Sequence, residues 1–357
     1  MAHLDISVVV TTYKRAAMVR DLVLSYIGQT GVNSELVIVD DCVEDKETER
    51  MLQPFLAMRQ DIRFIKNETN LGYSKNFLKS LIEARGSYIV TLGDDDILLG
   101  PHVLKKYVEV FQMYPNVGFI YSNILQFNDR YEMDWVYSHF PQDSRFVSLE
   151  DRLQSIWLKS CYIPGIGLRN SIDFARLYPA EDWLFPQVEL IGKILGTAEA
   201  YGIGEYLIGG RAHNDQLGFE AVKGRRIKKN ERHASLELLE IYKRVCQYYG
   251  EQGITTWPEE GFIQGFFVES HASILPTEKI NTGNLNLIRV FMRAVRKNPN
   301  ILVSPKYLFF MSLSLVMPRK ALLALKNLYK RLLVQRRWSR ERRLFHERLQ
   351  VLGIGSK

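Results

Sequence analysis

The sequence predicts an α/β fold in which a mainly parallel, Rossmann-like sheet is wrapped by helices. Short apolar, β-branched runs recur through the first third of the chain, and helix-spaced apolar residues lie between them. Continuous apolar runs are typical of strands that are covered on both faces. The repeated order of strand, helix and strand favours a parallel sheet, whose ligands bind at the carboxyl ends of its strands.

Five segments are expected to form strands: 6–10, 35–39, 62–65, 87–92 and 117–121. Apolar residues at helical spacing predict a helix between the first two strands and another before the fourth. Beyond about residue 125 the pattern is mixed and includes the glycine-rich stretch YGIGEYLIGG. A further helix is expected over about 228–249, where apolar residues gather near one face.

The chain has 357 residues, of which 46% are hydrophobic and 24% charged, as in globular proteins. We expect an α/β domain over 1–222, a helical region over 223–300 and a basic amphipathic tail over 301–357. No basic leader precedes the first apolar run, so we expect a cytoplasmic protein without a signal peptide. Cys42, Cys161 and Cys246 are odd in number and far apart, which predicts reduced thiols.

Positive charge is concentrated at the C-terminal end of the chain. Residues 285–357 hold 17 Lys or Arg and two acidic residues, whereas the rest holds the other 30 basic and 38 acidic residues. Such asymmetry indicates a polyanionic partner, either an anionic membrane surface or nucleic acid. The apolar run from Tyr307 to Met317 is too short to span a bilayer, which takes about 20 residues.

We therefore expect the tail to lie on the inner face of the plasma membrane, with no nucleic acid as partner. The alternative is that its leucines pack on the body of the protein or on another subunit. The sequence therefore leaves open whether the protein forms an oligomer. These leucines are Leu322, Leu323, Leu325, Leu328 and Leu332.

Three consecutive carboxylates, Asp94, Asp95 and Asp96, follow the apolar segment YIVTL. Adjacent like charges repel one another unless a cation or hydrogen-bond donors neutralise them. Mg²⁺ or Mn²⁺ would do so, because these ions take one or two carboxylates and complete their shell with phosphate and water. The alternative is a solvated acidic turn in which Asp96 caps the helix expected from about Pro101.

Two other expected strands also end in polar residues. The first ends at Thr11, Thr12 and Tyr13, and the second at Asp40 and Asp41. Because the carboxyl ends of parallel strands share one edge of a sheet, these residues are expected near the acidic triplet. Each strand end alone could simply meet solvent, but three together favour a ligand site.

These motifs resemble those of the inverting family 2 glycosyltransferases, which have the GT-A fold. The resemblance covers about residues 5–215 and rests on motifs in a fixed order: VVVTTYKR, VIVDDC, NETNLGYSKN, LGDDDIL and AEDWLF. It implies that Thr11, Tyr13 and Asp40 line the nucleotide base. It also implies that Asp94 lies near the ribose and metal and that Asp95 is the main metal ligand. Gly93 departs from the family pattern, in which Asp is common.

The resemblance extends the expected site beyond the triplet. Asp182 resembles the general base, with Glu181 as substitute, although both could simply begin a helix. Arg211 is expected to bind the diphosphate and His213 to bind the metal. The alternative is that both residues lie in a surface turn without a ligand. The full set of expected nucleotide contacts is Thr11, Tyr13, Arg15, Asp40, Asp41, Asn70, Lys75 and Asp94, and the expected metal ligands are Asp95, Asp96 and His213.

The resulting hypothesis is transfer of a sugar from a nucleotide-sugar donor, with UDP favoured, to a glycan or lipid-linked acceptor. The cofactor would be Mn²⁺ or Mg²⁺, and the product a bacterial surface polysaccharide. A nucleotidyltransferase is the alternative enzyme, but it would need a glycine-rich triphosphate loop where this chain has TTYKRAAM. The alternative from a different functional class is a non-catalytic protein that binds a membrane or nucleic acid through its tail.

Overall fold

The computed structural model describes residues 3–44, 46–137, 139–212, 234–254, 260–332 and 337–355. The chain forms two compact units. The first unit comprises Met1–Arg225 together with Trp338–Lys357, and the second comprises Arg226–Arg337. This division differs from the expected segments 1–222, 223–300 and 301–357, because the end of the expected tail belongs with the first unit.

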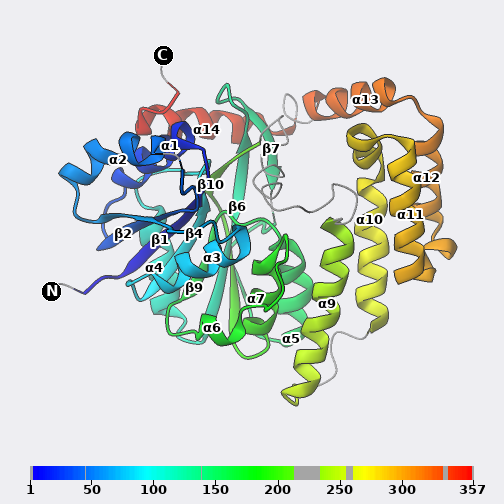
Figure 1. Cartoon of the computed structure of the whole chain (residues 1–357), viewed down its shortest axis with the longest axis horizontal. Helices are drawn as coiled ribbons and strands as arrows, with labels where there is room; N and C mark the ends of the chain where they lie inside the picture. The colour runs from blue at the N-terminus through cyan, green and yellow to red at the C-terminus, as the bar shows by residue number, and fades with distance from the viewer. Residues whose placement is uncertain are drawn as a thin grey trace. The chain divides into compact units, whose positions relative to one another are not determined.

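A ten-stranded sheet lies at the centre of the first unit (Figure 1), in the order β3-β2-β1-β4-β9-β6-β10-β5, with β7 on β6 and β8 on β10. The longest pairings, those of β1 with β2 and β4, β2 with β3 and β6 with β10, are parallel. The strands are β1 (Ile6–Thr12), β2 (Ser34–Asp40), β3 (Ile62–Lys66), β4 (Tyr88–Gly93), β5 (Ile97–Leu98), β6 (Val117–Phe127), β7 (Met133–Tyr137), β8 (Ser144–Phe146), β9 (Ile166–Arg169) and β10 (Glu199–Arg211). The mainly parallel α/β sheet is thus confirmed.

Helices connect the parallel strands, and Figure 1 shows α3, α6 and α7 on the face of the sheet toward the viewer. The chain moves outward through β1, β2 and β3, and α3 then carries it back past β1 to β4. Strand order therefore reverses between β1 and β4, which is where open sheets of this kind bind ligands. The helices are α1 (Ala16–Ile27), α2 (Glu47–Met58), α3 (Tyr73–Ile82), α4 (Val103–Met113), α5 (Leu149–Asp151), α6 (Phe174–Leu177), α7 (Pro186–Leu195) and α14 (Ser339–Leu352), with single turns at Arg152–Ile156 and Trp157–Lys159.

The last helix, α14, packs on the sheet unit although it is far away in the sequence. Phe345 is fully buried, and its ring lies 5.4 Å from that of Phe127 in β6. The guanidinium of Arg348 donates hydrogen bonds to the carbonyl oxygens of Leu99, at 2.8 Å, and of Tyr206. Because these contacts are buried and directional, α14 is part of the first unit rather than a free tail.

The second unit is helical. Its elements are α9 (Ala234–Glu251), α10 (Glu260–Thr282), α11 (Asn284–Lys297), a 3₁₀ turn (Pro299–Val303), α12 (Pro305–Val316) and α13 (Arg319–Leu332). The other four helices all contact α10. Lys279 of α10 donates to the carbonyl oxygens of Leu315 and Met317 at 3.1 and 2.6 Å, so it satisfies the C-terminal end of α12. In the described part of the chain no helix is long and apolar enough to cross a membrane.

Candidate active site

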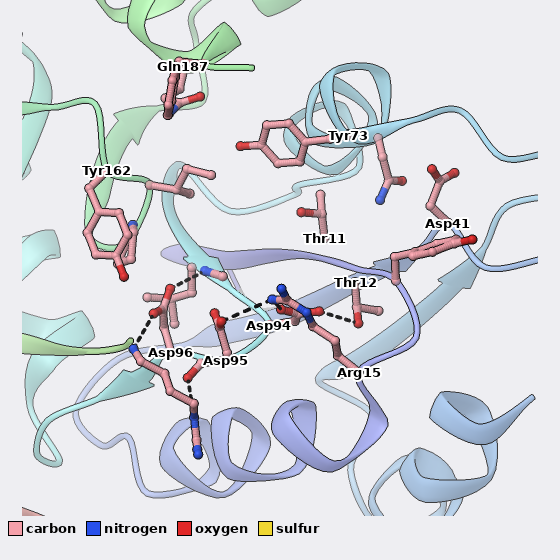
Figure 2. Close-up of a pocket in the computed structure, with 18 of the residues that line it drawn as sticks. Thr11, Thr12, Arg15, Asp41, Tyr73, Asp94, Asp95, Asp96, Tyr162 and Gln187 are labelled. Atoms are coloured by element: carbon pink, nitrogen blue, oxygen red, sulfur yellow. Dashed lines mark hydrogen bonds and ion pairs between the residues drawn. The ribbon is translucent and has the colours of Figure 1, made fainter. Parts of the chain in front are cut away.

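A cavity of about 390 Å³ opens at the carboxyl ends of β1, β2 and β4 (Figure 2). The loops after these strands bring the expected polar groups to one place. Lys14, between two lining residues, adopts a left-handed φ of 57°, which turns the loop after β1 back toward the cavity. The lining residues are Thr11, Thr12, Tyr13, Arg15, Asp41, Asn70, Tyr73, Asn76, Leu92, Gly93, Asp94, Asp95, Asp96, Cys161, Tyr162, Ile163, Pro164, Leu184, Phe185, Gln187 and Arg211.

Asp94 lies almost fully buried at the floor of the cavity. Its carboxylate accepts hydrogen bonds from the Thr12 hydroxyl at 2.8 Å and from the Arg15 guanidinium at 2.9 Å. Burial and the neighbouring charge of Asp95 raise the pKa of Asp94 to about 6, in spite of these donors. The same Arg15 nitrogen lies 3.2 Å from Asp95, so one guanidinium serves two carboxylates (Figure 2).

Asp96 has a different role from its two neighbours. Its carboxylate accepts from the backbone N–H of Gly93 at 2.6 Å and from that of Arg211 at 3.3 Å. It therefore closes the turn after β4 and joins this turn to the end of β10. The alternative in which Asp96 caps the next helix is wrong, since α4 begins at Val103. Burial raises the pKa of Asp96 well above its usual range.

The structure also shows why glycine suits position 93, where the resemblance led us to expect Asp. A Cβ atom at this position would lie 2.7 Å from a carboxylate oxygen of Asp95 and 2.7 Å from one of Asp96. Any side chain at position 93 would therefore require these carboxylates to shift. The close approach of these two carboxylates thus favours glycine at position 93.

Arg211 lines the cavity, but its charge is already balanced. Its guanidinium donates to Asp21 at 2.6 Å and lies 4.8 Å from the ring centre of Phe127. Its Nε donates to the backbone carbonyl of Asp95 at 3.4 Å. These contacts fix the acidic turn, and contact with a diphosphate stays a prediction. His213 lies outside the described residues.

The loop after β2 is organised by Asp41 rather than by Asp40. The Asp41 carboxylate accepts from the backbone N–H groups of Leu71 and Gly72 at 2.7 and 2.8 Å and from the Asn67 amide at 2.9 Å. Gly72 has a φ of 76°, as its place in the expected turn requires. Asp40 is buried and does not line the cavity, and its carboxylate accepts from the backbone N–H of Cys42.

Most of the expected nucleotide contacts lie together. Lys75 does not line the cavity, because α3 begins at Tyr73 and helical spacing directs Tyr73 and Asn76 inward. Lys75 is left exposed on the outer side of the first turn. The expected contacts that line the cavity are Thr11, Tyr13, Arg15, Asp41, Asn70 and Asp94.

Glu181 and Asp182 lie in the loop between α6 and α7, with Asp182 exposed. They precede α7, which begins at Pro186, so the alternative in which they form its first turn is wrong. Neither residue lines the cavity, although Leu184 and Phe185 of the same loop do. The assignment of Asp182 as the base therefore stays a prediction.

Sequence reasoning missed several residues that line the cavity. Tyr73 could have been found from helical spacing after Gly72, since it lies on the same side of α3 as Asn76. Gln187 lies in the first turn of α7, and Tyr162 lies in a loop without a recognisable motif. These two residues can be assigned to the site only when the fold that brings them together is known.

The side chains of the cavity fit a Mg²⁺ or Mn²⁺ ion that shares its shell with a ligand. Asp95 offers a carboxylate toward the cavity, whereas Asp96 is held by backbone N–H groups. Within the described residues no three acidic, His or Cys side chains form a complete metal cage. This arrangement matches Mg²⁺ chemistry, in which one or two carboxylates hold an ion that substrate phosphates and water also bind.

Comparison with known proteins places this site in a family. Residues 7–173 match the family model described as glycosyl transferase family 2. The chain contains a glycosyl transferase family 2 domain. This domain holds the strand ends and the acidic turn that form the floor of the cavity.

Relatives of the family 2 domain are similar over part of their length. An uncharacterized glycosyltransferase of Haemophilus influenzae is 32% identical over 116 residues, which are 32% of this chain and 37% of the relative. TuaG of Bacillus subtilis, provisionally assigned to teichuronic acid biosynthesis as a glycosyltransferase, is 32% identical over 91 residues, or 26% of this chain and 36% of TuaG. The chain thus spans less than half the length of these relatives.

Solved structures share the fold of the chain at low sequence identity. S. aureus TarS 1–349 in complex with UDP-GlcNAc has a TM-score of 0.61 at 15% identity, covering 83% of this chain and 81% of TarS 1–349. The mannosyltransferase PcManGT from Pyrobaculum calidifontis, in complex with GDP-Man and Mn²⁺, has a TM-score of 0.51 at 13% identity. The match covers 92% of this chain and 88% of PcManGT. These likenesses show the GT-A type of fold.

Proposed function

We propose that this protein is a metal-dependent, inverting glycosyltransferase that moves a sugar from a nucleotide-sugar donor to a lipid-linked glycan acceptor in surface polysaccharide synthesis. The observation that carries the proposal is the acidic turn of Asp94 and Asp95 with Arg15, at the strand-order reversal of a family 2 domain. TuaG supports the polysaccharide context. The complexes of TarS with UDP-GlcNAc and of PcManGT with GDP-Man and Mn²⁺ support the donor class and the metal.

The charges of the cavity argue for a bound cation. Among the described residues the lining carboxylates are Asp41, Asp94, Asp95 and Asp96, whereas the lining cations are Arg15 and Arg211. Arg211 is already paired with Asp21. A diphosphate would meet net negative charge here, and a divalent ion removes that repulsion. We therefore assign Asp95 as the main metal ligand, and the bound metal would stabilise charge on the leaving diphosphate.

The acceptor hydroxyl must lose a proton as it attacks the anomeric carbon, and we assign this step to Asp182. Asp182 is exposed in a loop whose Leu184 and Phe185 line the cavity, so a large acceptor such as the lipid-linked glycan that we propose can reach it. Attack from the side opposite the diphosphate inverts the anomeric centre. Glu181 is the neighbouring carboxylate against which this assignment is tested.

Donor binding is tested by a thermal-shift panel of nucleotides and nucleotide sugars, with and without Mn²⁺. We expect at least one nucleotide sugar to raise the melting temperature, with UDP derivatives favoured, and the shift to need the metal. If no nucleotide stabilises the protein under either condition, the proposed function is wrong.

The base is tested by Asp182→Asn, with Glu181→Gln as the matched control. We expect Asp182→Asn to lower kcat by about 10²–10⁴-fold while donor affinity and melting temperature stay unchanged, because the side chain is exposed. Glu181→Gln should retain most of the activity. Equal losses in the two variants would contradict the assignment.

We further propose that the second unit binds an anionic membrane surface. On α13, Leu325, Leu328 and Leu332 are 53%, 53% and 44% exposed, and helical spacing puts them on one face. On α12, Phe309 and Val316 are also exposed. Of the five leucines that could have packed on the body, only Leu322 is buried within the described structure. Apolar stripes beside basic residues are typical of helices that lie in a membrane interface.

This surface is best tested by substitution, because truncation near Ser304 would also remove α14 from the first unit. We expect Leu328→Glu with Leu332→Glu to lower binding to phosphatidylglycerol vesicles by about tenfold or more. Met58→Glu is the control, since Met58 is 73% exposed in the first unit. Unchanged binding of the double variant, or wild-type binding that is equally strong to neutral vesicles, would refute the proposal.

A further inference from the structure

Two polar groups in the cavity have hydrogen-bonding capacity that the described protein does not use. The Tyr73 hydroxyl and the Gln187 side-chain oxygen are both buried, and neither has a hydrogen-bond partner among the described residues. Both residues line the cavity, and in Figure 2 both oxygens point toward the same part of it. Buried polar groups in folded proteins almost always have a hydrogen-bond partner. Two such groups without one among the described residues, facing the same cavity, therefore indicate that a ligand forms hydrogen bonds with them when it binds.

The Gln187 amide can face the cavity in one orientation only. Its nitrogen donates to the Cys161 carbonyl at 2.8 Å, and a flipped amide would place two oxygens against each other. Gln187 is 1% exposed, so its side chain has no room to turn outward. The group that faces the ligand is therefore an oxygen that can only accept a hydrogen bond.

The Tyr73 hydroxyl complements this acceptor. Burial raises its pKa well above the usual range, so it stays neutral and can both donate and accept. A diphosphate brings only acceptors and would leave Gln187 unsatisfied. Sugar hydroxyls both donate and accept, so they can pair with both groups. The apolar residues Pro164 and Leu184, which line the same cavity, suit the C–H face of a sugar ring.

We propose that Tyr73 and Gln187 bind hydroxyl groups of the sugar that is transferred and thereby determine which donor the enzyme accepts. This inference rests on the proposed function and deepens it. Tyr73 comes from the first turn of α3 and Gln187 from the first turn of α7, so two elements far apart in the sequence build one sugar subsite.

The test is calorimetric titration of the wild type, Tyr73→Phe and Gln187→Met with a nucleoside diphosphate and with its nucleotide sugar, in the presence of Mn²⁺. We expect each variant to bind the nucleotide sugar about tenfold more weakly and the nucleoside diphosphate within about twofold of the wild type. Tyr73→Phe should not lower the melting temperature, because its hydroxyl has no partner within the described residues.

Tyr26→Phe serves as the control, since the Tyr26 hydroxyl is bonded to Asp61 at 3.0 Å and does not line the cavity. It should change neither affinity. Equal losses for the diphosphate and the nucleotide sugar would overturn the sugar subsite, as would a higher KM for the acceptor with unchanged donor affinity. A wild type that binds no nucleotide would instead refute the proposed function itself.

Discussion

The two units of this protein handle polar and apolar groups in opposite ways. The first unit buries charged groups around its cavity, such as Asp94, Asp96 and Arg211, and provides each with specific donors or acceptors. The second unit leaves large apolar side chains exposed along α12 and α13, including Phe309 and Val316, at 62% and 82%. Satisfied buried charges indicate a small polar ligand, whereas an exposed apolar stripe indicates an extended partner.

The largest expected difference is in the free energy of unfolding, between substitutions of two apolar residues near the C-terminal end of the chain. Phe345→Ala should lower the free energy of unfolding by about 3–5 kcal/mol, because Phe345 is fully buried against the sheet unit. Leu325→Ala should change it by less than about 0.5 kcal/mol, since Leu325 is 53% exposed. Urea unfolding measures both. Similar losses in the two variants would mean that α13 is as much a part of the core as α14.

Substitution of two glycines by alanine should show a smaller difference in stability. A Cβ atom at Gly86 would lie 2.6 Å from backbone atoms of Ile6 and Ser7, so Gly86→Ala should destabilise the protein by about 1–3 kcal/mol. At Gly250 in α9 no described atom lies within 4 Å, and Gly250→Ala should stabilise by about 0.5–1 kcal/mol. Melting temperatures that shift in the same direction would contradict this difference in packing.

The smallest expected effect is a dependence of stability on pH. Burial and the positive charge of Lys159 lower the pKa of His139 to about 4, from 6.5. The unfolded chain thus takes up a proton near pH 6.5 while the folded chain does not, so the stability that is present above pH 6.5 is lost as the pH falls toward 4. We expect about 1–2 kcal/mol of this loss to disappear in His139→Gln. An unchanged pH profile of unfolding in that variant would show that other groups cause it.

The sequence predicted the central sheet well because its strands are continuous apolar runs. All five expected strands exist, as β1, β2, β3, β4 and β6. The glycine-rich stretch after residue 200 was not recognised as part of a strand. In β10 the glycines are needed where other atoms approach closely, as at Gly202, where a Cβ atom would lie 2.5 Å from the Phe140 ring. Such a strand lacks the β-branched residues on which pattern reasoning depends.

The acidic turn was predictable for a similar reason, since Asp94 and Asp95 directly follow a strand whose end is fixed by the sheet. Residues in loops were harder to predict. The position of Asp41 rather than Asp40 depends on which carboxylate the 67–72 loop binds. Gln187 required knowledge of how α7 packs near Cys161. Contacts between distant segments decide these positions, and one sequence does not display them.

The central claim is that the acidic turn and its metal act on the diphosphate of a nucleotide sugar. It is tested most directly by measuring release of nucleoside diphosphate from a panel of nucleotide sugars in the presence of Mn²⁺, with wild type and Asp95→Asn compared. We predict release from at least one donor, lowered by about 100-fold or more in Asp95→Asn. Equal rates in the two proteins, or no release from any donor, would contradict the account.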